Sequence, residues 1–245
     1  MVSTTRTVDP LSPAETGVLN GLAHTLWLPP VTRTRPPPRP AGVVVLHGAD
    51  SCKESHHDFA RAAAGAGLAA IVFDQRGHGD SDGAMGASAI DDVVTMAVRL
   101  RQAIGDPAAP VALRGSSMGG WLALVAAGPA QAVAVVAVCP ASAAGLARGV
   151  RAGAFAFAVD APAFLTLLES HDLGDAVRTS AAPLLLMHAE GDERVPVAHS
   201  RELAALATAP GSRLIVVPGG HHRSVQHDEE LQAVSLRFIA RAAGA

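Results

Sequence analysis

Short, continuous apolar runs recur along this chain and constrain its fold more than any other feature. Each run is rich in Val, Ile or Leu and does not alternate with polar residues. The runs cover residues 43–47, 69–74, 111–115, 133–139, 184–189 and 214–218. Continuous runs of this kind are typical of strands buried on both faces of a parallel sheet.

Segments with a helical pattern separate the runs, near residues 54–66, 88–105, 117–128, 199–208 and 226–243. Strands that alternate with helices predict a doubly wound, mostly parallel α/β sheet. Residues 17–29 predict an N-terminal β-hairpin ahead of this series. The segment RTRPPPRP at 33–40 predicts an extended connector, with a proline-rich ligand for an SH3-type partner as the alternative.

One connection is longer than the others. About 40 residues separate the runs at 133–139 and 184–189, whereas a parallel crossover needs only a dozen or more. We therefore predict one domain over residues 1–245, with a small cap of two or three short helices inserted at about 140–182. The apolar residues of 155–168 are expected to form the cap core, and some of them to line a substrate pocket.

Composition narrows the functional class. Hydrophobic residues make up 49% of the chain and charged residues 17%, which suits one sizeable core. A net charge of −3 with scattered basic residues argues against nucleic acid as a partner. The sequence shows neither a secretory apolar segment nor a membrane span, so we expect a cytoplasmic protein that does not contact membranes. Cys52 and Cys139 match no metal spacing and are expected to be free thiols.

A Gly-Ser-Ser-Met-Gly-Gly segment follows the apolar run at 111–115. Gly115, Ser117 and Gly119 satisfy the pattern G-x-S-x-G, which makes Ser117 the central serine and Ser116 a spacer. The expected order of strand, tight turn and helix is the context in which such a serine acts as a nucleophile. Its hydroxyl then needs a base within hydrogen-bond reach and an acid that orients the base.

Two later loops offer these partners, because each directly follows an apolar run and so lies at the same edge of the sheet. The loop after 184–189 contains Asp192, flanked by Glu190 and Glu193. The loop after 214–218 contains His221 and His222. His227, five residues beyond, is expected to belong to the last helix.

With HGADSCKE, FDQRGHGDSDG, RGSSMGG, HAEGDERVP and PGGHH in register, the sequence resembles an α/β-hydrolase over residues 17–243. The match is loosely closest to the dienelactone-hydrolase and serine-aminopeptidase-like branches. The resemblance implies the chain order serine, acid, histidine. The pattern D-x-x-V-P then selects Asp192 as the acid, and P-G-x-x-H selects His222 over His221 as the base.

The resemblance also implies an oxyanion hole formed by the backbone N–H groups of Ala49 and Met118. His47 and His78 are assigned structural roles. Two residues depart from the family pattern: His221 stands beside the base, and Ala189 replaces a glycine often found after the strand histidine, here His188.

These features predict a cofactor-free, metal-free serine esterase that acts on a small to medium, largely apolar acyl substrate. The same three residues would also serve a thioesterase, a peptidase or amidase, a lactonase or a carbon–carbon hydrolase. A ligand-binding protein that retains the hydrolase fold is the alternative from a different class. Oligomeric state is left open.

Overall fold

The computed structural model describes residues 12–30 and 40–244. The expected connector at 33–40 therefore lies outside the described residues, apart from Pro40. No helix in the described ranges has both the length and the apolar character that crossing a membrane requires.

Eight strands form one sheet in the spatial order β1-β2-β4-β3-β5-β6-β7-β8. Strands β3 to β8 run parallel, and β1 and β2 pair antiparallel at one edge. The strands are β1 Glu15–Leu19, β2 Leu22–Trp27, β3 Gly42–Leu46, β4 Ala69–Phe73, β5 Val111–Ser116, β6 Ala132–Val138, β7 Leu184–Ala189 and β8 Arg213–Val217. The predicted mostly parallel α/β sheet with an N-terminal hairpin is confirmed.

The hairpin has a local cause. Asn20 and Gly21 both have positive φ, 52° and 79°, as a two-residue turn requires if it is to match the twist of its strands. Strands β3, β4, β5 and β7 are buried at every position, which explains why their sequences are mostly apolar; Arg114 and Ser116 in β5 and His188 in β7 are buried polar exceptions.

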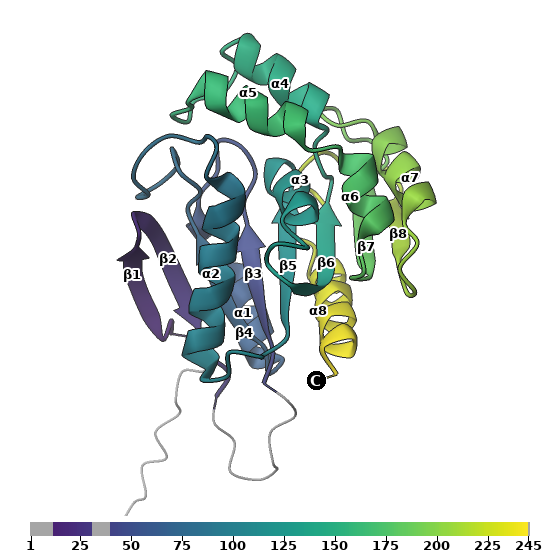
Figure 1. Ribbon diagram of the computed structural model, residues 1–245. Helices are drawn as coiled ribbons and strands as arrows, with labels where there is room; N and C mark the ends of the chain where they lie inside the picture. The colour runs from purple at the N-terminus through teal and green to yellow at the C-terminus, as the bar shows by residue number, and fades with distance from the viewer. Residues whose placement is uncertain (1–11, 31–39, 245) are drawn as a thin grey trace, which may run out of the picture.

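Helices cover both faces of the sheet (Figure 1). One face packs on α2 and α3, and the other packs on α1 and α8; a separate hydrophobic core fills each side. The helices are α1 His57–Gly65, α2 Ala89–Ile104, α3 Met118–Val125, α4 Ala143–Arg151, α5 Ala161–Ser170, α6 Leu173–Thr179, α7 Val197–Leu206 and α8 Glu229–Ala243, with a short 3-10 helix at Lys53–His56 before α1.

Three helices connect β6 to β7. Figure 1 shows α4 and α5 lying over the carboxyl ends of the strands, whereas α6 lies beside the sheet between α3 and α7. The part of the insertion that covers this edge is therefore α4, α5 and the loop between them.

The last helix begins later than the sequence suggested. Asp228 caps it by accepting a hydrogen bond from the Leu231 N–H, so the helix starts at Glu229. The assignment of His227 to this helix was wrong, and His227 lies in the preceding loop instead.

Candidate active site

The turn between β5 and α3 holds Ser117 in a strained conformation, with φ 53° and ψ −117°. Its tightness explains the flanking glycines. A Cβ on Gly115 would overlap the carbonyl of Gly119, and a Cβ on Gly119 would collide with the backbone at Leu46 and His47. The chain bears this strain where the Ser117 side chain is presented at the N-terminus of α3.

Asp192 and His222 lie close together at the carboxyl ends of the parallel strands, where Ser117 also lies. Asp192 comes from the loop after β7, and His222 comes from the loop after β8. His222 Nδ1 lies 2.7 Å from Asp192 Oδ2. The Asp192 side chain is fully buried and that of His222 is 9% exposed, so water competes little for this hydrogen bond. His222 and Ser117 line one small recess of about 60 Å³.

The hydrogen bonds of the neighbouring residues distinguish the alternatives. His221 Nδ1 accepts a hydrogen bond from the Arg223 N–H, within its own loop. Glu193 Oε2 accepts a hydrogen bond from the backbone N–H of His222 at 3.1 Å. Glu190 forms a surface pair with Arg201. The structure thus brings His222 and Asp192 together, while His221, Glu190 and Glu193 make other contacts.

Several donors converge on the Asp192 carboxylate. Oδ1 accepts from the backbone N–H groups of Arg194 and Val195, each at 2.9 Å, and His188 Nε2 lies 3.3 Å from Oδ2. Burial alone would raise the pKa of this carboxyl, but the hydrogen bonds from His188, His222 and the two N–H groups outweigh it. The pKa of Asp192 therefore lies well below its ordinary value, and the group stays ionised beside His222.

Two residues around Asp192 were not found by sequence reasoning. His188 contacts Asp192 from inside β7, and its other ring nitrogen lies 2.7 Å from Ser200 Oγ. The Cys139 sulfur lies within 4.8 Å of the ligand atoms of Asp192 and His222. Burial, together with the nearby carboxylate, raises the pKa of the Cys139 thiol to about 12, so it remains neutral. Cys139 is distant from Asp192 in the sequence, whereas His188 precedes Asp192 by four residues.

The loop after β3 runs beside the nucleophile. A Cβ on Gly48 would lie 3.3 Å from the Cβ of Ser117, so Ala49 follows immediately at the mouth of the recess. In the described part of the chain, neither the Ala49 N–H nor the Met118 N–H donates to another protein group. Both donors are available to an oxygen of a bound substrate.

His47 and His78 stabilise the surrounding loops. His47 Nε2 accepts from the Gln75 N–H at 3.0 Å, and burial with the neighbouring His78 lowers the pKa of His47 to about 4. His78 stacks on Phe157 beneath the cap, with ring centroids 4.1 Å apart. The same loops are held by Lys53, which forms ion pairs with Asp74 and Asp80.

A larger cavity opens from Ser117 towards α4. Its volume is about 450 Å³. Its walls combine apolar and charged side chains: Leu146, Phe155, Val195 and Pro196 with Asp50, Arg148 and Arg194. The cap therefore covers a space that opens directly onto the candidate nucleophile.

Residues 37–170, more than half of the chain, match the family described as serine aminopeptidase, S33. The protein belongs to this family. The match covers the elbow at Ser117 and the loop that carries Ala49, and it confirms the resemblance to α/β-hydrolases. No curated protein matches this S33 chain significantly.

Solved structures with the same fold accompany the family match. Est1E from Butyrivibrio proteoclasticus, solved with ferulic acid, superposes with a TM-score of 0.73 at 19% identity, covering 95% of this S33 chain and 100% of Est1E. A monoglyceride lipase from Saccharomyces cerevisiae, solved with a substrate analogue, gives 0.69 at 16% identity, covering 98% and 97%. A monoacylglycerol lipase from Paleococcus ferrophilus gives 0.67 at 19% identity, covering 91% and 98%.

Proposed function

We propose that this S33-family protein is a serine esterase that hydrolyses carboxylic esters of small to medium acyl substrates through an acyl-enzyme. The observation that carries the proposal is the buried 2.7 Å hydrogen bond between His222 and Asp192, in a recess that also contains the elbow serine. The fold neighbours support the choice of bond, since their names describe esterases and lipases.

In the first step, Ser117 Oγ attacks the ester carbonyl while His222 takes the serine proton. Asp192 holds the imidazole by its Nδ1–H, which leaves Nε2 as the proton acceptor, and stabilises the imidazolium that forms. The N–H groups of Ala49 and Met118 donate hydrogen bonds to the oxyanion of the tetrahedral intermediate.

When the intermediate collapses, His222 returns the proton to the leaving alcohol and the acyl group stays on Ser117. Water then enters, His222 removes one of its protons, and a second tetrahedral intermediate releases the acid and restores the serine. Each step needs only the triad, the two N–H donors and water.

Turnover of 4-nitrophenyl acetate and 4-nitrophenyl butyrate tests the proposal. We expect the wild type to hydrolyse both and His222→Ala to lose at least about 10³-fold in kcat. The matched control is His221→Ala, which removes the adjacent imidazole and should retain activity. Folded wild type that hydrolyses no ester, or an inactive His221→Ala beside an active His222→Ala, would overturn the proposal.

A further inference from the structure

The cavity between Ser117 and α4 contains two cationic side chains from different elements. Arg148 comes from α4, and Arg194 comes from the loop after β7. The Arg148 guanidinium makes no ion pair and no hydrogen bond with any residue that the structure describes. Arg194 Nε lies 4.0 Å from Glu193 Oε1, and both of these side chains are well exposed. The cavity therefore holds positive charge that the surrounding protein leaves largely unpaired.

The acidic residue of the cavity wall, Asp50, has other contacts. Its Oδ1 accepts hydrogen bonds from the backbone N–H groups of Ala156 at 2.7 Å and Phe157 at 3.3 Å. Asp50 thus fastens the loop between α4 and α5 to the loop after β3. The start of α4, at Ser142 and Gly145, also lines the cavity and adds the positive end of a helix dipole.

The two spaces that meet at Ser117 differ greatly in size. The recess beside His222 holds about 60 Å³, and the cavity under α4 holds about 450 Å³. His222 must protonate the departing oxygen, so the leaving group lies on the His222 side and extends towards solvent, since Arg223 and His227 in the wall of the recess are exposed. The acyl group of the substrate therefore occupies the larger cavity, which is lined by Arg148 and by Arg194, the latter shared with the recess.

We propose that the preferred substrates are esters whose acyl chain ends in a carboxylate, with Arg148 and Arg194 as the residues that select it. This rests on the proposed esterase function and refines its expectation of a largely apolar substrate. Leu146, Phe155 and Val195 contact the methylene chain, while the guanidinium groups bind the far carboxylate, to which their planar geometry is matched.

The test compares two methyl esters by acid release at constant pH. Monomethyl glutarate has a terminal carboxylate, and methyl 5-methylhexanoate replaces it with an isopropyl group of the same shape. We expect the wild type to prefer the half-ester by about tenfold or more in kcat/KM, as for hydrogen bonds to a charged group. The preference should shrink when ionic strength is raised to about 0.5 M, because the side chains are exposed.

Three variants test whether the preference for the half-ester depends on Arg148 and Arg194. Arg148→Ala and Arg194→Ala should each lower the ratio of the two kcat/KM values, and Arg148→Lys should restore part of it. Arg151→Ala is the matched control, since Arg151 lies on the same helix but pairs with Glu169 outside the cavity. It should leave the ratio unchanged.

A second substrate pair locates the anion. The pair is 4-acetoxybenzoate and 4-isopropylphenyl acetate, which carry the charge or its neutral mimic on the leaving group. We expect Arg148→Ala to leave the ratio for this pair unaltered, because Arg148 lines only the larger cavity, whereas Arg194 lines both spaces. If Arg148→Ala changes this ratio instead of the first, the assignment to the acyl side is overturned.

Different results would overturn the proposed carboxylate preference and the proposed esterase function. A wild type that hydrolyses the neutral ester through Ser117 but shows no preference for the half-ester overturns the inference alone. The same is true if Arg151→Ala lowers the ratio as much as Arg148→Ala. Absence of hydrolysis with every ester overturns the esterase function itself.

Discussion

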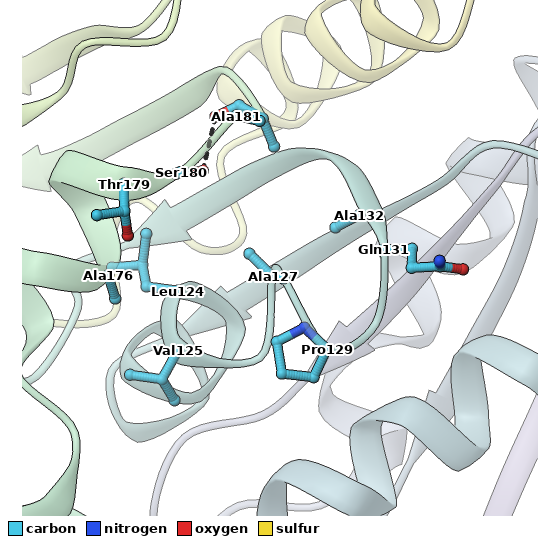
Figure 2. Close-up of a pocket in the computed structure, with 12 residues that line it drawn as sticks. Leu124, Val125, Ala127, Pro129, Gln131, Ala132, Ala176, Thr179, Ser180 and Ala181 are labelled. Atoms are coloured by element: carbon cyan, nitrogen blue, oxygen red, sulfur yellow. Dashed lines mark hydrogen bonds between the residues drawn. The ribbon is translucent and has the colours of Figure 1, made fainter.

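Two cavities of similar volume lie at opposite ends of the parallel strands, called here the carboxyl edge and the amino edge of the sheet. The one at the carboxyl edge, about 450 Å³, contains Ser117, Arg148 and Arg194. The other, about 410 Å³, lies at the amino edge between the end of α3, the start of β6 and the segment before β7 (Figure 2). None of the described residues that line the amino-edge cavity carries a charge.

The two hydroxyl groups that line the amino-edge cavity already donate hydrogen bonds to backbone carbonyls. Ser180 Oγ donates to Ala182 O, as Figure 2 shows, and Thr179 Oγ1 donates to Asp175 O. At the carboxyl edge, in contrast, a strained serine, a buried hydrogen bond between His222 and Asp192, and the guanidinium groups of Arg148 and Arg194 converge. Because ligands of open parallel α/β sheets bind outside the carboxyl ends of the strands, the contrast favours the cavity at Ser117 as the candidate site.

The largest effect is expected at the acid of the carboxyl edge. Asp192→Asn retains the shape of the side chain but no longer fixes the protonated nitrogen of His222, so kcat should fall by about 10³- to 10⁴-fold. Steady-state ester hydrolysis measures this. The control is Glu190→Gln, a carboxylate in the same loop that pairs with Arg201 at the surface. Equal losses in both variants would contradict the role of Asp192.

Asp192 should also shape the stability of the protein in acid. Its folded-state pKa lies below its unfolded value, so its stabilising contribution is complete above a pH of about 4 and is lost as pH falls through the folded-state pKa. Urea unfolding from pH 7 down to about pH 3 should show the difference in unfolding free energy between wild type and Asp192→Asn shrinking in acid. A difference that grows in acid would contradict this sign.

A smaller effect is expected where the cap is attached. Asp50→Ala removes the acceptor of the Ala156 and Phe157 N–H groups and should raise KM by about three- to tenfold, with less change in kcat. Asp50→Asn keeps an oxygen at Oδ1 and also tolerates the positive φ of 55° at this position. It should behave like the wild type, and a raised KM in both variants would instead implicate the charge of Asp50.

The smallest effect is expected from a pair of variants that compares the two cavities directly. Ala154 and Ala181 are both exposed alanines, the first in the carboxyl-edge wall and the second in the amino-edge wall. Ala154→Leu should change KM by about threefold or more by filling acyl space. Ala181→Leu should leave both kcat and KM unchanged. Equal effects of the two variants would show that the cavities are not functionally distinct.

The sheet and the elbow could be predicted because their causes are local in sequence. Continuous apolar runs mark buried parallel strands, and observed β6, Ala132–Val138, differs from the predicted run by one residue at each end. Glycines two positions on either side of Ser117 mark a turn that admits no side chain there. The candidate acid and base follow strand ends, which the topology brings to one edge.

Other features depend on tertiary packing and leave no such trace. The contact of Cys139 with Asp192 arises between the ends of the neighbouring strands β6 and β7, whereas His188 lies only four residues before Asp192; the apolar pattern records only that each of the two positions is buried. Whether a helix of the insertion covers the site or packs beside the sheet depends on the helices that it contacts. The sequence does not show that α6 packs on α3 and α7, so the predicted cap at 140–182 includes it. Arg148 is one of several scattered arginines until the fold places it beside Ser117.

The most direct test of Ser117 as the nucleophile is labelling with a fluorophosphonate probe, with the adduct located by peptide mass spectrometry. Wild type and Ser116→Ala should carry the adduct on Ser117, Ser117→Ala should carry none, and His222→Ala should label far more slowly. A folded wild type without an adduct, or an adduct on Ser116, would contradict the assignment of Ser117.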